Sequence, residues 1–264
     1  REKSLYLCNK LSKRYVNQLN QHKQRMNFQY ENNTNQYSPA QFSIMPPVCK
    51  NLLIINVICY LATIVLRSRG INLTELFGLH FFAASHHHIW QWVTYSFFHG
   101  SFSHLFFNMF AIWMFGYTLE NVWGSKRFIL YCLVSALGAA LMQEITYFFM
   151  YKDLLSGVYT NVKIGDDRVP VEDFLNSINT IGASGIVFGL LAAFGLMFPN
   201  TTVYFYFLLP IKTKWFVLGY IALELLNGVL GTSDGVAHFA HLGGALAGFI
   251  LLFIWKKQRD KYRY

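Results

Sequence analysis

Apolar residues gather in six runs along the chain, and the length of these runs suggests helices that cross a lipid bilayer. The runs cover residues near 51–66, 102–119, 128–150, 180–198, 213–230 and 237–255. A helix needs about 17–25 mostly apolar residues to span the hydrocarbon core of a membrane. The 51–66 run is the shortest, so its ends are the least well defined. The pattern predicts an all-α membrane protein with six transmembrane helices.

The segments between the runs differ in polarity. Residues 1–47 are mostly polar, and we expect a disordered cytoplasmic arm, with residues 1–25 as an extension outside the working protein. Residues 67–101 are aromatic-rich but too polar to span, which suits a loop lying at the membrane interface. The loop 151–179 is long and acidic. One membrane domain, residues 48–256, followed by a basic tail, 257–264, accounts for the rest.

Composition strengthens the membrane assignment. Hydrophobic residues make up 54% of the 264 residues and charged residues 13%. The charged share is about half of that in ordinary soluble domains. A membrane protein is therefore favoured before any motif is considered.

The basic residues indicate how the chain is oriented. If the N-terminus is cytoplasmic, 17 of the 22 Lys and Arg residues lie in cytoplasmic segments. The other five are Arg67, Arg69, Lys152, Lys163 and Arg168. Cytoplasmic loops of membrane proteins carry an excess of positive charge. We expect both termini in the cytoplasm, and we expect the membrane to be a bacterial plasma membrane.

The charge and cysteine patterns argue against other classes of partner. The net charge of +9 is explained by flanks that face anionic lipid. The basic residues form no patch interleaved with aromatic residues, so we predict no nucleic-acid partner. The four cysteines show no paired spacing, so we expect neither a disulfide framework nor a zinc site. No cofactor is predicted.

Polar residues within the apolar runs are the most informative, because each is costly in lipid unless it has a partner or a task. They are Ser184, His238, His241, His104, Asn108, Glu144 and Glu224. We interpret the two glutamates as interhelical hydrogen-bond partners. They could instead serve a proton-coupled transporter, but no inverted repeat or pair of broken helices accompanies them.

Glycine spacing predicts that Ser184 and His241 meet. His241 shares a helix face with Gly244 and Gly248, and Gly185 and Gly189 are four residues apart just after Ser184. Such small-residue faces let two helix backbones approach closely. An imidazole beside a hydroxyl can take its proton and make the oxygen nucleophilic. The alternative is a glycine-packed helix pair whose histidine only bonds a backbone carbonyl.

His104 and Asn108 are candidates for stabilising an oxyanion. They lie four residues apart on one helix face, and an imidazole N–H and a carboxamide can both donate to developing negative charge. A structural hydrogen-bond pair between helices is the alternative. With a cytoplasmic N-terminus, His104, Asn108, Ser184 and His241 all lie near the outer ends of their helices. We therefore expect them at similar depth.

Four motifs then resemble those of the rhomboid intramembrane serine proteases, over roughly residues 50–255. They are "GASG" with Ser184, "AHLGGALAG" with His241, "HGSFSHLFFN" with His104 and Asn108, and "GYTLENVWGSKRF" with Gly116, Glu120 and Gly124. The resemblance implies a six-helix bundle of the minimal bacterial type. It also implies that the first external loop is partly embedded in the membrane.

The resemblance further implies roles for individual residues. Ser184 would be the nucleophile and His241 the general base and acid, in a dyad without a third, acidic member. The backbone N–H of Ser184 would join His104 and Asn108 in the oxyanion hole. The family's His-x-x-Gly-x-x-x-Gly pattern selects His241 rather than His238. Phe188 would lie against the catalytic imidazole.

One position departs from the family pattern. Family members often carry Trp-Arg in the first loop, whereas Trp90 is followed here by Gln91. An arginine-mediated contact with the Glu120 region is therefore not expected, although a glutamine can still form hydrogen bonds.

The site residues and the resemblance together predict an intramembrane serine endopeptidase that acts near the outer membrane face, and the resemblance implies that its substrates are single-pass transmembrane proteins. The alternative is a catalytically silent rhomboid-like protein that binds membrane clients. A metalloprotease would need a His-Glu-x-x-His run, which the sequence lacks. An aspartyl intramembrane protease would need two helix-borne aspartates, and every aspartate lies in a predicted loop or tail.

Overall fold

The computed structural model describes residues 43–205, 209–231 and 236–261. The chain divides into two units, residues 1–43 and residues 44–264, and the fold below is that of the second unit. The polar arm expected over residues 1–47 lies almost entirely outside the described residues. So does the end of the basic tail, although the last helix continues to Lys261.

In the described part of the chain, six long helices form the bundle, and they coincide with the six apolar runs. They are α2 (Pro47–Arg67), α5 (Phe102–Trp123), α6 (Ser125–Tyr151), α8 (Ser184–Met197), α9 (Thr213–Leu230) and α10 (His238–Lys261). Short helical elements are α3 (Leu73–Phe77), α4 (Gln91–Thr94), α7 (Val171–Ser177), η1 (Tyr95–Phe97) and η2 (Lys152–Ser156). The all-α membrane bundle is confirmed.

Within the described residues, four helices are both long and apolar enough to cross a membrane: α2, α6 together with η2, α9 and α10. The other two long helices each meet one of these two conditions. α5 has 22 residues, but His104, Asn108 and Glu120 lower its hydropathy. α8 is strongly apolar but has only 14 residues, a rise of about 21 Å. The count of six spanning helices therefore stays a prediction.

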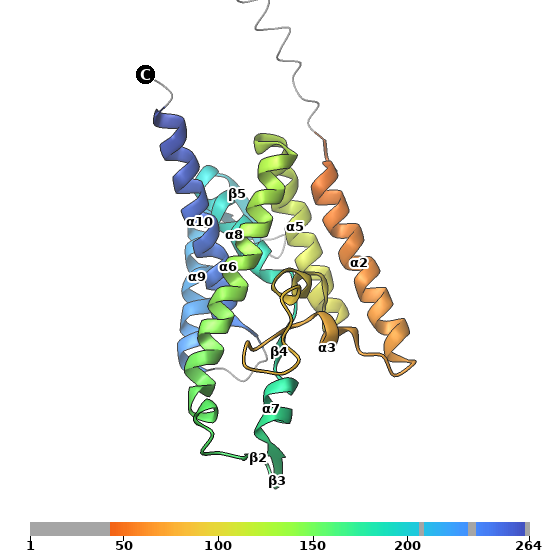
Figure 1. The fold of residues 1–264 in the computed structure, drawn as a ribbon. Coiled ribbons are helices and arrows are strands. Elements are labelled where there is room, and N and C mark those ends of the chain that lie inside the picture. Colours follow the sequence, from red (N-terminus) through yellow and green to blue (C-terminus); the bar gives the residue numbers. More distant parts are fainter. Residues whose placement is uncertain (1–42, 206–208, 232–235, 262–264) are drawn as a thin grey trace, which may run out of the picture. The chain divides into compact units, whose positions relative to one another are not determined.

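α8 is the central helix of the bundle. All ten of its residues from Gly185 to Phe194 are buried, as expected for a helix that is apolar on every side. It packs against α5, α6, α9 and α10, and Figure 1 shows it behind α6 and α10. Its first residue, Ser184, is therefore held within the bundle by its neighbours.

Glycines bring the backbones of α8 and α10 together. A Cβ atom added to Gly244 would clash with the carbonyl oxygen of Gly185 and lie 2.8 Å from its carbonyl carbon. This contact confirms the predicted pairing of the two small-residue faces. Gly248, assigned to the same face, packs instead against the Tyr131 ring and Ser135 of α6. The glycines of α10 therefore pack against two neighbouring helices, α8 and α6.

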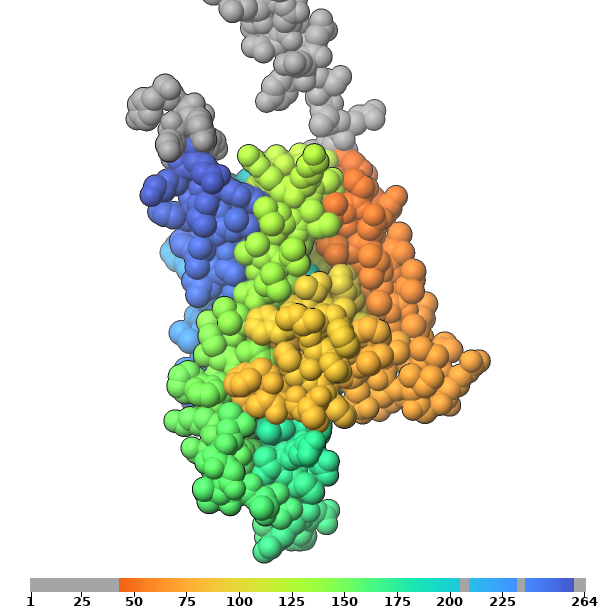
Figure 2. All heavy atoms as spheres, viewed as in Figure 1, coloured from red at the N-terminus to blue at the C-terminus, as the bar shows by residue number. Residues whose placement is uncertain are grey.

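Among the residues that the structure describes, the connections between helices contain three short antiparallel ladders. They pair β1 (Leu79–His80) with β4 (Asn179–Thr180), β2 (Asn161–Ile164) with β3 (Asp167–Pro170), and β5 (Thr202–Phe205) with β6 (Leu209–Lys212). The β1–β4 ladder joins the loop before α5 to the segment that leads into Ser184. Figure 2 shows this loop, coloured orange to yellow, as a continuous mass between α2 and α6.

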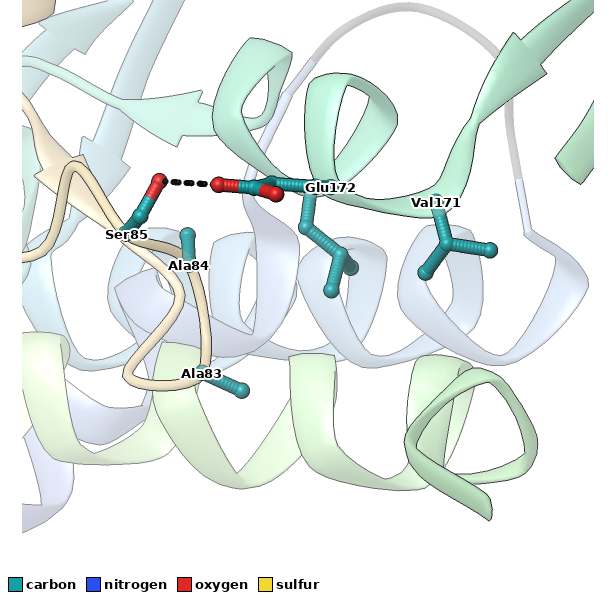
Figure 3. A pocket seen from close by; sticks show the side chains of 6 residues that line it. Ala83, Ala84, Ser85, Val171 and Glu172 are labelled. Atoms are coloured by element: carbon teal, nitrogen blue, oxygen red, sulfur yellow. Dashed lines mark hydrogen bonds between the residues drawn. The ribbon is translucent and has the colours of Figure 1, made fainter. Parts of the chain in front are cut away.

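The same loop borders a pocket of about 290 Å³ against α7. The pocket is lined by Ala83, Ala84, Ser85, Val171, Glu172 and Leu175. Figure 3 shows the Ser85 hydroxyl donating to the Glu172 carboxylate at 3.1 Å across it. None of the predicted site residues lines this pocket, so the candidate chemistry lies elsewhere.

Candidate active site

Ser184 is positioned by a short connection between β4 and α8. Gly182 turns the chain with a φ of 130°, a conformation that side chains rarely tolerate. Its N–H donates to the carbonyl of Tyr95 at 3.0 Å, and the N–H of Ala183 donates to His99 Nε2 at 3.4 Å. The first loop therefore fixes the backbone on the approach to Ser184.

The structure brings Ser184 and His241 into direct contact. His241 Nε2 lies 2.7 Å from Ser184 Oγ, across 57 residues of sequence. His241 is buried in the second turn of α10. A hydroxyl and an imidazole at this distance share a hydrogen bond, which is the contact that the glycine spacing predicts.

The imidazole of His241 is held on one face by an aromatic column. The Phe188 ring stacks on it with centroids 4.4 Å apart and planes 9° apart. The Tyr220 ring of α9 stacks on the other side of Phe188 at 5.1 Å. The predicted contact between Phe188 and the imidazole is confirmed. The column restricts the tilt of the histidine ring.

His104 borders the same small space as Ser184. A Cβ atom added to Gly182 would lie 2.8 Å from His104 Nε2 and 3.6 Å from Ser184 Oγ. The His104 ring also contacts the buried His99 ring edge-on at 4.9 Å. A hydrogen on His104 Nε2 is therefore close enough to be donated to a group that is bonded to Ser184 Oγ.

Asn108 is buried and lies one turn after His104 in α5. Its Nδ2 donates to the carbonyl of His104 at 2.8 Å. One amide hydrogen of Asn108 is therefore donated within the helix, and the second remains to donate to a bound ligand.

Backbone N–H groups add further donors. Ser184 is the first residue of α8, and the N–H of Val187 is the first to bond back, to the carbonyl of Ala183. The N–H groups of Ser184, Gly185 and Ile186 therefore have no carbonyl acceptor within α8. A helix N-terminus also favours negative charge.

Sequence reasoning did not assign Glu224 to this site. Its Oε2 lies 3.0 Å from His241 Nδ1 and 2.7 Å from His238 Nδ1. The interpretation of Glu224 as an interhelical partner is correct, since it joins α9 to α10. The dyad implied by the resemblance has no acidic member, whereas a carboxylate here contacts the imidazole. The only signal in the sequence was a glutamate inside an apolar helix.

Glu144 and Gln91 both stabilise the first loop rather than the site. Glu144 accepts a hydrogen bond from the N–H of Phe82 at 2.9 Å. The interpretation of Glu144 as an interhelical partner is therefore wrong, because Phe82 lies in the first loop. Gln91 is fully buried, and its Oε1 accepts from the N–H groups of His80 and His88. Its Nε2 donates to the carbonyls of Leu76 and His86.

Glu120 accordingly has partners other than the first loop. Its two carboxylate oxygens accept from the N–H groups of Val48, at 3.0 Å, and Cys49, at 2.7 Å, at the start of α2. The hydroxyl of Ser125 donates to it at 2.6 Å. The junction between α5 and α6 therefore anchors the start of α2, and position 91 contributes nothing to this contact.

Burial favours the neutral form of two histidines in the first loop, His99 and His80. The pKa of His99 is lowered to about 3, first by burial and then by the nearby His104. The pKa of His80 is also lowered, mainly by burial. A neutral His99 keeps a lone pair on Nε2 for the N–H of Ala183.

Among the described residues, Glu224, His238 and His241 form one group that could hold a metal, with their donor atoms within 4.8 Å of one another. Zinc ligands at 2.0–2.1 Å in a tetrahedron are separated by about 3.3 Å. The separations of 2.7 and 3.0 Å to Glu224 are shorter and match hydrogen bonds. The geometry fits a hydrogen-bonded cluster better than a metal site.

Comparison with known proteins agrees with this geometry. Residues 86–258 match the Rhomboid domain, which covers most of the chain. The chain therefore belongs to the rhomboid family of membrane proteins.

Similar proteins come from plants and bacteria. The chain is 28% identical to RHOMBOID-like protein 6, mitochondrial, of Arabidopsis thaliana over 185 residues, which are 66% of this chain and 49% of the relative. It is 26% identical to Rhomboid protease AarA of Providencia stuartii over 227 residues, 81% of this chain and 74% of that protein. It is 25% identical to Rhomboid protease GlpG of Serratia proteamaculans over 168 residues, 62% of this chain and 48% of that protein.

Several of the matches cover less than half of the relative's length. The chain spans 37–49% of the length of three Arabidopsis relatives. Membership of the family and the integral membrane character follow from these matches and from the apolar helices.

Proposed function

We propose that the protein is an intramembrane serine endopeptidase with Ser184 as nucleophile and His241 as general base. The observation that carries this proposal is the 2.7 Å contact between Ser184 Oγ and His241 Nε2. In acyl transfer, Nε2 takes the hydroxyl proton as Oγ attacks the peptide carbonyl. The imidazolium then gives that proton to the leaving amine.

The oxyanion of the tetrahedral intermediate would form beside the start of α8. Its negative charge would be stabilised by the N–H of Ser184 and by His104, which borders the same space. Asn108 would contribute its second amide hydrogen. Preorganised donors of this kind are each worth about 3–4 kcal/mol in the transition state.

The proposed substrates are single-pass transmembrane proteins. Two relatives are named proteases, and this chain is a membrane-embedded member of their family. An intact transmembrane helix hides its carbonyls in i→i−4 hydrogen bonds, so a substrate must unwind locally before Ser184 can attack. We place the cut near the outer membrane face, with both termini of the enzyme in the cytoplasm.

A cleavage assay tests this function. The purified protein is incubated in lipid with a single-pass test substrate, beside the Ser184→Ala and His241→Ala variants. We expect cleavage by the wild type, and a loss of at least about 10³-fold in either variant. Cleavage that survives Ser184→Ala would contradict the assignment. A folded wild type that binds the substrate without cutting it would indicate the catalytically silent alternative.

A further inference from the structure

Glu224 lies at the nitrogen of His241 that faces away from Ser184. Its Oε2 is 3.0 Å from His241 Nδ1, while Nε2 of the same ring is 2.7 Å from Ser184 Oγ. The three groups come from α9, α10 and α8 and form one continuous line of hydrogen bonds. Both Glu224 and His241 are buried, at 7% and 8% exposure, so water competes little for these contacts.

A neutral imidazole carries one hydrogen, and its partner decides which nitrogen holds it. A carboxylate only accepts hydrogen bonds, so the hydrogen of His241 must be on Nδ1 to satisfy Glu224. Nε2 then keeps its lone pair toward the Ser184 hydroxyl. This is the tautomer that a general base requires.

His238 supports the carboxylate from a second direction. Its Nδ1 lies 2.7 Å from the same Glu224 oxygen, one turn before His241 on α10. Two ring donors converge on one oxygen atom and hold the side chain of Glu224 in one position. The Phe188 ring restricts the plane of His241 at the same time.

We propose that Glu224 is a positioning residue that acts through His241, so that the site works as a Ser–His–Glu triad rather than a dyad. The proposal rests on the protease function proposed above. When Ser184 Oγ bonds to the substrate carbonyl carbon, its proton passes to Nε2. The Nδ1 hydrogen stays on the ring, and Glu224 remains a carboxylate that stabilises the imidazolium.

Steady-state cleavage by Glu224→Gln tests the proposal. The amide is nearly the same size but loses the charge, and its NH₂ group can pair with Nδ1 in the wrong tautomer. In serine proteases of known mechanism the corresponding change lowers kcat about 10⁴-fold. We expect a fall in kcat of about 10- to 10³-fold with KM within about twofold, and partial recovery of kcat in Glu224→Asp.

Glu144→Gln is the matched control. Glu144 is equally buried, at 5% exposure, but its carboxylate accepts from the N–H of Phe82 in the first loop. We expect its kcat to stay within about twofold of the wild type. A kcat for Glu224→Gln within twofold of the wild type, or an equal loss in both glutamine variants, would overturn the proposal.

A second measurement does not depend on how the variants fold. The ¹⁵N spectrum of histidine-labelled wild type at neutral pH should show His241 with hydrogen on Nδ1 and none on Nε2. The opposite tautomer would overturn the inference. If the wild type neither cleaves the substrate nor reacts at Ser184, the proposed function itself has failed, which is a separate result.

Discussion

At the residue scale, the candidate site depends on hydrogen bonds that fix single rings and single backbone groups. The pairing of Ser184 with His241 could be predicted, because glycine spacing marks the faces on which two helices meet. The contact between Glu224 and His241 could not be predicted. A sequence shows that a glutamate lies in an apolar helix, but not how that helix is rotated against its neighbours.

The buried neutral state of His99 predicts a pH effect on stability. Its pKa is lowered to about 3 in the folded protein, mainly by burial. The unfolded chain, with an ordinary value near 6.5, takes up a proton as the pH falls below that value, whereas the folded protein does not. Stability is therefore lost as the pH falls from about 6.5 toward 3.

The His99→Gln variant tests this effect, because glutamine keeps an acceptor but does not titrate. Between pH 7.5 and pH 5, the unfolding free energy of the wild type should fall by about 2 kcal/mol more than that of the variant. Denaturant unfolding in detergent at the two pH values measures the difference. Equal losses in both proteins would mean that His99 is protonated in the fold.

At the element scale, the long helices follow from the sequence and the short strands do not. Each of the six apolar runs corresponds to a helix. In lipid, a single apolar segment can satisfy all its backbone hydrogen bonds internally only as a helix. The strands have two to four residues, which is too short to show the alternation that marks a strand. The β1–β4 ladder nevertheless joins the first loop to the segment before Ser184.

The close packing of α8 and α10 predicts the effect of Gly244→Ala. The added methyl group meets the backbone of Gly185, which cannot rotate away. Overpacking usually costs about 1–3 kcal/mol, and separating these helices also lengthens the contact between Ser184 and His241. We expect a lower midpoint of thermal unfolding and slower substrate cleavage.

Gly219→Ala is the control for that change. Gly219 lies inside α9, and a Cβ atom added there meets nothing within 4 Å. Alanine in a helix is favoured over glycine by up to about 1 kcal/mol, so this variant should be as stable as the wild type or slightly more so. If both alanine variants behave alike, the glycine contact between α8 and α10 has no special role.

At the scale of the whole molecule, the charge distribution predicts how the protein is oriented in the membrane. Figure 1 shows the β2–β3 hairpin and the C-terminal end of α10 at opposite ends of the bundle. Lys163 belongs to β2, and Lys256 lies near the C-terminal end of α10. Both residues are exposed. The excess of basic residues in the flanking segments predicts that position 256 is cytoplasmic and position 163 is external.

Single cysteines at these positions test the orientation. In a background without the natural cysteines, a membrane-impermeant maleimide added to intact cells should label Lys163→Cys. It should label Lys256→Cys only after the membrane is opened. Labelling of both positions from the same side, or of position 256 from outside, would contradict the proposed topology.

We propose that His241 makes the Ser184 hydroxyl nucleophilic inside the membrane domain. The rate at which a fluorescent fluorophosphonate labels the purified protein measures this most directly. We predict one adduct, on Ser184, that is absent from Ser184→Ala and forms at least about 10²-fold more slowly in His241→Ala. Labelling at an unchanged rate without His241, or no labelling of Ser184 in the folded wild type, would contradict the account.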